Sequence, residues 1–291
     1  GFPNNIMNFG NSAGVHYAFA ESLLRCYSNK VVKYMTAIIE TKELSITFGG
    51  HTAVDSVSIS VPHNHFKSII GPNGAGKTTF FNLLSGQLAP TKGQVMYKGS
   101  DITKLSPTKR TRAGIGRSFQ ITNVFPNLTV MENVRLAVQS HEGVRYQMLR
   151  HFRSFKEFEE QAEEWLKLVL LNDKKDALAT NLAHGEKRKL EIAMLLALNT
   201  EVLLLDEPTA GMSLEEVPAI LEVIRKIKQR GDRTIILIEH KMDMIMDLSD
   251  TIMVLFNGAL LADGTPKEIM KNETVQSAYL GGLHNEHAAE A

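Results

Sequence analysis

A glycine-rich stretch, Gly71–Thr79 (GPNGAGKTT), has the residue types and the spacing of a phosphate-binding loop. It follows a short apolar run, Phe66–Ile70, and precedes a segment with helical spacing of apolar residues. Glycines let successive backbone N–H groups converge on a phosphate, and the positive end of the following helix adds to the attraction. We expect Lys77 to reach the β- and γ-phosphates of a nucleotide and Thr78 to bind Mg²⁺ through its hydroxyl. The nucleotide-binding residues predicted here are Gly71, Pro72, Asn73, Gly74, Ala75, Gly76, Lys77, Thr78 and Thr79.

Two acidic residues end a second apolar run, Val202–Pro208 (VLLLDEP). We expect Asp206 to lie beside the phosphate-binding loop and to hold Mg²⁺ through water. Glu207, one residue further, points to the other side of the chain and can act as the general base that orients a water for attack on the γ-phosphate. Two acids at a strand end also fit an ordinary solvated turn, but the phosphate-binding loop in the same chain favours catalysis.

The elements that must position these residues follow from the hydrophobic pattern. Val202–Pro208 and Thr234–His240 (TIILIEH) are continuous apolar runs, which predict strands buried on both faces in a parallel sheet covered by helices. Leu44–Phe48 and Val57–Val61 alternate apolar and polar residues, as half-buried strands do. Residues 123–180 have a helical and charged pattern.

Two local signals near the end of the chain predict a turn and a helix start. Asn257 and Gly258 stand between two apolar runs, which is a strong signal for a β-hairpin. Thr265–Glu268 (TPKE) has the pattern of a capping box with proline at the first helical position.

The composition bounds the class of protein. The 291 residues include 32 basic and 32 acidic side chains, so no overall field attracts nucleic acid, and we expect no nucleic-acid partner. The single Cys26 excludes an internal disulfide and fits a reducing compartment. No apolar run approaches the roughly 18 residues of a membrane-spanning helix, so a role at a membrane would require a partner.

The chain is expected to divide into three parts. Residues 1–34 lack regular patterning and begin with Gly1. No cationic start precedes an apolar core there, so we expect no secretory signal. We interpret them as an added or upstream-translated extension, with a native extension as the alternative. Residues 35–282 form the catalytic domain, and residues 283–291 form a polar tail.

Further short motifs in the sequence resemble those of a known protein family. The phosphate-binding loop, SFQ with Gln120, LAHGE at Leu182–Glu186, LLLDEP, AGMS and IEH with His240 occur in that order. Over Ile38–Gly282 this order resembles the ATP-binding cassette (ABC) family. The resemblance implies an α/β fold: a P-loop NTPase (RecA-like) core, an N-terminal antiparallel β subdomain, and a helical subdomain inserted at about 121–190. It also implies that the chain is an ATPase that uses ATP and Mg²⁺.

The resemblance assigns roles to individual residues. Phe48 matches the aromatic residue that stacks on adenine, with a buried strand aromatic as the alternative. Gln120 matches the glutamine that senses Mg²⁺ and the attacking water, and His240 matches the histidine that contacts the γ-phosphate. The implied catalytic residues are Glu207, His240 and Gln120, and the implied metal ligands are Thr78, Gln120 and Asp206.

LAHGE matches the family signature usually written LSGGQ, which caps the ATP of a second subunit in a head-to-tail dimer. The matching residues are Leu182, Ala183, His184, Gly185 and Glu186. Gly185 would let the backbone approach the γ-phosphate, and the charged residues 186–189 are interpreted as a solvated helix start. Ala183 lacks the usual serine hydroxyl, and a hydrogen bond to a charged group contributes about 1.5–3 kcal/mol, so we expect weaker dimer closure. Ser213 stands where aspartate is frequent, which leaves coupling across the dimer open.

AGIGRSFQ, the long helical stretch, DEPTAGMS and the ending GTPKEI…AYLGG resemble the ATPases of branched-chain amino acid importers. The resemblance implies a subunit that energises uptake of these or related small solutes through ATP-driven dimer closure. The implied partners are a second copy or a related ABC ATPase, a membrane permease that docks on 120–180, and indirectly an extracytoplasmic solute-binding protein. The implied location is cytoplasmic, peripheral on the inner face of the cell membrane.

Three other functions are weighed. An ABC exporter ATPase is the nearest alternative. A soluble ABC ATPase acting on ribosomes or DNA usually carries two cassettes or a long coiled-coil insertion, and neither pattern is found here. A nucleotide switch that binds without hydrolysing is disfavoured by Glu207 and His240.

Overall fold

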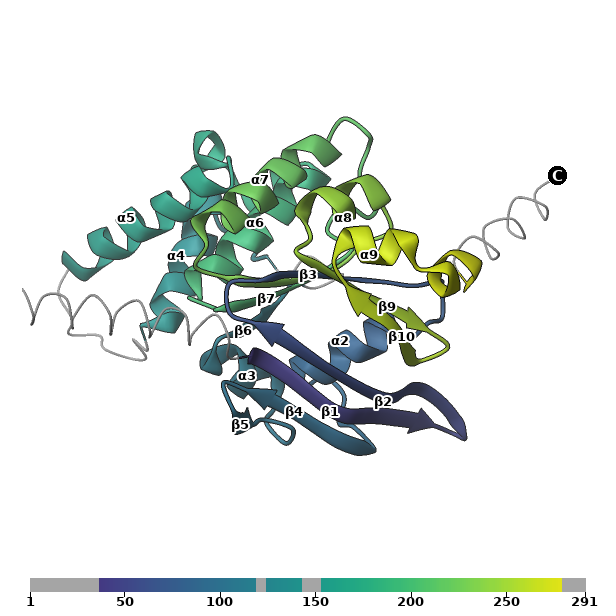
Figure 1. The fold of residues 1–291 in the computed structure, drawn as a ribbon. Coiled ribbons are helices and arrows are strands. Elements are labelled where there is room, and N and C mark those ends of the chain that lie inside the picture. Colours follow the sequence, from purple (N-terminus) through teal and green to yellow (C-terminus); the bar gives the residue numbers. More distant parts are fainter. Residues whose placement is uncertain (1–36, 119–123, 143–152, 279–291) are drawn as a thin grey trace, which may run out of the picture.

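The computed structural model describes residues 37–118, 124–142 and 153–278. Near the N-terminus of this region an antiparallel sheet has the strand order β2-β1-β4-β5 (Figure 1). Its strands are β1 (Ala37–Phe48), β2 (His51–Pro62), β4 (Lys92–Tyr97) and β5 (Ser100–Asp101). The predicted alternation is confirmed in β2, where Val57, Ile59 and Val61 are buried and the serines between them are exposed. It is wrong for the end of β1, where Ser45 is buried beside Leu44 and Ile46 because its hydroxyl accepts from the Ser56 N–H, and where Phe48 is exposed.

A second, six-stranded sheet has the order β10-β9-β3-β8-β7-β6 and is parallel except for the hairpin of β9 and β10. Its strands are β3 (Phe66–Ile70), β6 (Ile115–Arg117), β7 (Val202–Asp206), β8 (Thr234–Ile238), β9 (Thr251–Phe256) and β10 (Ala259–Gly264). All residues of β3, β7 and β8 are buried, as their continuous apolar runs predict. The carboxyl ends of neighbouring parallel strands therefore meet at one edge of this sheet.

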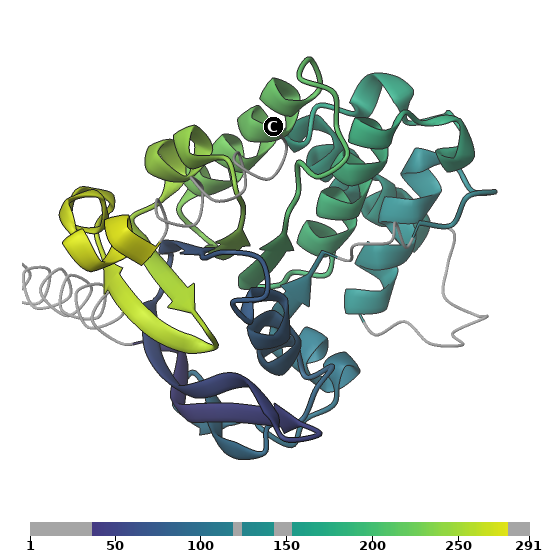
Figure 2. The same ribbon diagram turned by 90° about the vertical axis from the view of Figure 1, so that its right-hand side faces the viewer.

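Helices cover both faces of the six-stranded sheet. α2 (Lys77–Ser85) lies between the two sheets, where its Phe80 and Phe81 share a core with Val202 and Leu204 of β7 (Figure 2). Leu203 and Leu205 of β7 point to the opposite face and join a second core beneath the remaining helices. This division of alternate residues is the expected result for a strand that is buried on both sides.

The helical subdomain lies to one side of the sheets, where α4 and α5 pack against α6 (Figure 1). The helices outside the sheet sandwich are α3 (Pro107–Ala113), α4 (Val130–His141), α5 (Arg153–Leu168), α6 (His184–Ala197), α7 (Val217–Arg230), α8 (Met242–Leu248) and α9 (Pro266–Lys271), with 3₁₀ turns at Asn172–Lys174 and Ala179–Asn181. α9 begins with the predicted capping box, since Thr265 accepts from the Glu268 N–H and Glu268 accepts from the Thr265 N–H.

The β9–β10 hairpin turns at Asn257 and Gly258, whose φ angles of 49° and 79° are those of the predicted tight turn. The turn also supports distant residues. The Gly258 carbonyl accepts from the Asp55 N–H at 2.8 Å, and the Gly258 N–H donates to the Ala75 carbonyl at 3.2 Å. The turn that Asn257 and Gly258 form thus holds part of the phosphate-binding loop in place.

Candidate active site

The phosphate-binding loop joins the end of β3 to the start of α2, and two of its glycines allow close backbone contact. Gly71 has φ 153°, and a Cβ there would lie 2.1 Å from the Leu255 carbonyl oxygen. Gly76 has φ 92°, and a Cβ there would lie 2.3 Å from the Ala53 carbonyl oxygen. No other side chain fits either position without moving the backbone, so β9 and β2 hold the loop from both sides.

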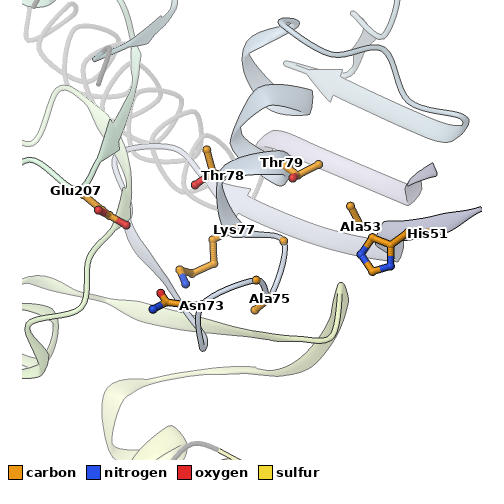
Figure 3. Close-up of a pocket in the computed structure, with 10 residues that line it drawn as sticks. His51, Ala53, Asn73, Ala75, Lys77, Thr78, Thr79 and Glu207 are labelled. Carbon is orange, nitrogen blue, oxygen red and sulfur yellow. The ribbon is translucent and has the colours of Figure 1, made fainter. Parts of the chain in front are cut away.

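A cavity of about 320 Å³ lies in front of this loop (Figure 3). It is lined by residues 73–79 of the loop, by Glu207, and by His51 and Ala53 of β2. His51 and Ala53 are not among the site residues predicted from the sequence. The available signal was their position three and five residues after Phe48, on the strand that turns back over the loop.

Lys77 points along the loop. Its Nζ donates to the Gly71 carbonyl at 2.7 Å and to the Pro72 carbonyl at 2.9 Å. Burial lowers the pKa of Lys77 below its usual value, while Glu207 and Asp206 act in the opposite direction. The ammonium is thus held among hydrogen-bond acceptors at the cavity, where it can exchange carbonyl oxygens for phosphate oxygens.

Asp206 is fully buried at the end of β7. Its Oδ2 accepts from Nη2 of Arg117 at 2.7 Å, whereas its buried Oδ1 has no hydrogen-bond partner in the described part of the chain. Burial raises the pKa of Asp206, and Arg117 opposes the shift. An unpartnered carboxylate oxygen fits a hydrated cation, so the residues present are suited to Mg²⁺, with Asp206 and Thr78 as the groups that would hold it.

Arg117 is a site residue that the sequence analysis did not identify. Its Nη1 donates to Asn82, Ser85 and Gln87, so one guanidinium ties the end of α2 to the carboxylate of β7. Its position in AGIGRSFQ, after a glycine-rich turn, offered no charge pattern from which the contact could be inferred.

Glu207 and His240 lie together, although the sequence analysis assigned their roles separately. Nε2 of His240 is 2.9 Å from Oε1 of Glu207. Glu207 has φ 45°, a left-handed conformation that is uncommon for a non-glycine residue, and its N–H donates to the Ile238 carbonyl at 2.9 Å. Glu207 lines the cavity, while His240 approaches Glu207 from outside the cavity lining.

Phe48 lies at the end of β1 and is 47% exposed, so the alternative of a buried strand aromatic is wrong. It stands outside the lining of the cavity. Gln120, predicted as a catalytic residue and metal ligand, lies outside the described residues.

The signature residues Leu182–Glu186 lie at the start of α6 and not in the lining of the cavity. Glu186 accepts from the Ala183 N–H at 3.0 Å, and the Gly185 N–H donates to Oε1 of Glu216 at 3.2 Å. His184 is exposed. The site residues of one chain therefore form two separate groups.

The interpretation of residues 186–189 as a solvated helix start is wrong for Arg188. Its side chain is only 11% exposed, pairs with Glu191 at 2.8 Å, and donates to the carbonyls of Asp206 at 2.9 Å and Glu207 at 3.3 Å. The long guanidinium reaches from the first turns of α6 to the end of β7, a contact that helical periodicity does not reveal.

A family profile described as "ABC transporter" matches residues 54–210, which is more than half of the 291 residues. The chain is an ATP-binding cassette of the ABC transporter family. Its enzymatic activity is ATP hydrolysis, and the predicted α/β fold and family resemblance are confirmed. A second profile, described as "Branched-chain amino acid ATP-binding cassette transporter", matches residues 259–285 of the cassette.

Curated relatives match the cassette over most of its length. It is 39% identical over 249 residues to the high-affinity branched-chain amino acid transport ATP-binding protein BraF of Pseudomonas aeruginosa, covering 84% of this chain and 98% of that protein. Identity to the corresponding protein LivG of Escherichia coli is 37% over 251 residues, with coverage of 84% and 98%. The lipopolysaccharide export system ATP-binding protein LptB of Haemophilus influenzae is 31% identical over 245 residues, with coverage of 84% and 98%.

Solved structures confirm the architecture of the cassette. The ADP conformation of MJ1267, an ATP-binding cassette of an ABC transporter, superimposes with a TM-score of 0.72 at 28% identity, covering 84% of this chain and 99% of that one. The dimeric structure of MJ0796, a bacterial ABC transporter cassette, gives a TM-score of 0.66 at 25% identity, with coverage of 78% and 98%.

Proposed function

We propose that the cassette is the ATP-hydrolysing subunit of an importer for branched-chain amino acids or related small solutes. The observation that carries this proposal is the match of residues 259–285 to the branched-chain amino acid family, in a region separate from the general ABC match at 54–210. The higher identity to BraF and LivG than to LptB supports import over export.

The proposed chemistry uses Lys77, Thr78 and Glu207, which line the cavity, together with His240 and Asp206, which lie outside its lining. Lys77 binds the phosphates of ATP, and Glu207 accepts the proton of a water that attacks the γ-phosphate. His240 holds the Glu207 carboxylate through the 2.9 Å contact and is placed to approach the γ-phosphate. Thr78 and Asp206, with Gln120 as a further ligand, would hold Mg²⁺, which would neutralise charge on the phosphates.

The second group of site residues is proposed to act on a partner's ATP. The start of α6, with Gly185, does not line the cavity of its own chain, and its positive helix end can face a nucleotide held by another subunit. The Gly185 N–H, which donates to Glu216 in the single chain, would exchange that carboxylate for a phosphate oxygen. The dimeric MJ0796 cassette, a structural neighbour, supports this arrangement. The partner is a second copy or a related ATPase, and ATP binding closes the pair.

Within the described residues the structure contains no helix that is long and apolar enough to cross a membrane. We propose that permease subunits dock on the helical region 120–180 at the inner face of the membrane, with a solute-binding protein on the outer side. Two exposed apolar side chains of this region, Phe125 at 52% and Leu178 at 41%, support such a contact.

The proposal is tested by reconstituting the full chain in liposomes with the membrane subunits that co-purify with it. Uptake of labelled leucine, isoleucine and valine is measured with and without ATP on the cassette side. We expect ATP-dependent accumulation, which is lost in a matched complex carrying Glu207→Gln. ATP-dependent release of solute, or no amino acid movement while ATP is hydrolysed, contradicts the proposal.

A further inference from the structure

Glu239 is a buried acidic residue, 3% exposed, that stands between the end of β8 and His240. Its Oε1 accepts hydrogen bonds from the N–H of Thr209, at 3.2 Å, and from the Thr209 hydroxyl. Its Oε2 accepts from the N–H of His240 at 2.8 Å and from the N–H of Lys241 at 3.4 Å. Both oxygens are therefore occupied by donors.

These donors belong to two different loops. Thr209 lies two residues after Glu207, in the turn that follows β7. His240 and Lys241 lie in the loop that follows β8 and leads into α8. Since β7 and β8 are neighbouring parallel strands, a single buried carboxylate joins the loop that carries Glu207 to the loop that carries His240.

The turn after β7 needs such support. Glu207 has φ 45°, and a non-glycine residue in this region persists only where the surrounding structure holds it. The turn is fixed by the Glu207 N–H bond to Ile238, by the Ala210 N–H bond to the Glu207 carbonyl at 3.0 Å, and by Glu239 through Thr209. Of these, only Glu239 also bonds the backbone of His240.

We propose that Glu239 is a positioning residue for ATP hydrolysis, which sets the distance between Glu207 and His240 by anchoring both of their loops. This inference rests on the proposed roles of Glu207 and His240. It deepens them, because it names the group that keeps the catalytic carboxylate and the imidazole within hydrogen-bond reach.

A carboxylate suits this position for a chemical reason. Its two oxygens offer about four acceptor sites, and it donates nothing when ionised. Glutamine has nearly the same shape but replaces one oxygen with an NH₂ group, which cannot accept. In Glu239→Gln, either the Thr209 side or the His240 side must lose its acceptor, and no cavity is created.

The first measurement is the kinetic profile of full-length Glu239→Gln. A displacement of about 1 Å at a reacting group can cost about 10²-fold in rate, so we expect kcat to fall by about 10- to 100-fold. ATP affinity should stay within about threefold, because Lys77 and the phosphate-binding loop are untouched. The matched control is Glu268→Gln, which makes the same change at a carboxylate that also accepts an N–H and a hydroxyl, from Thr265, but outside the site. We expect wild-type kcat for the control.

A double-mutant cycle separates positioning from general destabilisation. His240→Ala, Glu239→Gln and the double variant are compared in kcat. If Glu239 acts through His240 and Glu207, the double variant should be no more than about threefold slower than His240→Ala alone, because coupled effects do not add. Multiplicative effects would overturn the proposal.

Three further results distinguish positioning from a structural role and from failure of the proposed function. Thr209→Val keeps the N–H but removes the hydroxyl donor, so it should lower kcat by less than Glu239→Gln, with Thr200→Val as the matched buried control. A loss of ATP affinity and melting temperature in Glu239→Gln, with kcat per folded molecule unchanged, would show a structural role only and overturn the inference. Wild-type kcat in Glu207→Gln and His240→Ala would instead overturn the roles on which the inference rests.

Discussion

Nε2 of His240 lies 2.9 Å from Oε1 of Glu207, although 33 residues separate them in sequence. An ionised carboxylate only accepts hydrogen bonds, so the His240 tautomer with its proton on Nε2 is the one that fits this contact. The contact holds one carboxylate oxygen of Glu207, a residue that lines the cavity. It forms because β7 and β8 are adjacent parallel strands whose ends meet at the same sheet edge.

Glu207→Gln removes the proposed general base while keeping the shape of the side chain. A positioned general base contributes about 10²- to 10⁴-fold, so kcat should fall by that order. ATP binding, measured by titration with a fluorescent analogue, should persist because the phosphate-binding loop is unchanged. Exposed Glu215, nearby in the chain, supplies the control variant Glu215→Gln, which should keep full turnover. Unchanged turnover in Glu207→Gln would remove it from the mechanism.

Gly185 and Ala183 test whether α6 contacts a partner's ATP. A Cβ at Gly185 would lie 3.1 Å from Oε1 of Glu216, so Gly185→Asp places a carboxylate beside Glu216 and at the mouth of the helix. The new carboxylate would face the γ-phosphate of the partner's ATP, and two negative charges repel strongly in a dry interface. The ATP-closed dimer should therefore be lost. Ala183→Ser should favour the dimer by adding a phosphate hydrogen bond.

The dimer fraction is measured by sedimentation with ATP, with both changes made separately in a Glu207→Gln background. ATP binding by the Gly185→Asp monomer serves as the control, since Gly185 does not line the cavity of its own chain. Equal dimer fractions for Gly185→Asp and Ala183→Ser would argue against contact in trans.

Arg117→Gln tests the buried ion pair at the end of β7. Removing one partner of a buried pair leaves an uncompensated charge, which typically costs about 3–5 kcal/mol of stability. We expect the urea midpoint to fall accordingly. Arg112→Gln, a change at an exposed arginine of α3, should have little effect. A loss below about 1 kcal/mol for Arg117→Gln would mean that the Asp206 charge is compensated by other groups.

His65 provides a pH dependence far from the site. Burial lowers the pKa of His65, and the neighbouring Asp250 opposes this only in part. The folded chain therefore binds this proton less readily than the unfolded chain does. The contribution of neutral His65 to the free energy of unfolding is complete above the unfolded-state pKa of about 6.5. It is lost as the pH falls through the pKa of His65 in the folded chain.

Unfolding by urea at pH 7.5 and pH 5 measures this contribution. The loss of stability on acidification should be smaller in His65→Gln than in the wild type. His141→Gln, at an exposed histidine, should keep the wild-type pH dependence. Equal pH dependence in all three proteins would show that His65 is not protonated on unfolding in this range.

The sequence alone determined the features that depend on local backbone chemistry. GPNGAGKTT requires glycine where φ is positive, and the loop has that conformation at Gly71 and Gly76. The apolar runs at β7 and β8 predict strands buried on both faces, and Asn257-Gly258 predicts the hairpin, because strand burial and tight turns are encoded by neighbouring residues. The role of Glu207, inferred from its position at the end of an apolar run, and the role of His240, implied by family resemblance, both remain predictions.

Only the tertiary structure decided which side chains meet across the sheet. Arg117 reaches Asp206 over 89 residues, Arg188 reaches the end of β7 from α6, and Glu239 joins two loops. In the sequence these residues are ordinary charges at a strand end, a helix start and a loop, so local patterns assign them to solvent. Their partners are set by strand order and by long side chains that bury their charges against distant carboxylates, carbonyls and N–H groups, which no local periodicity encodes.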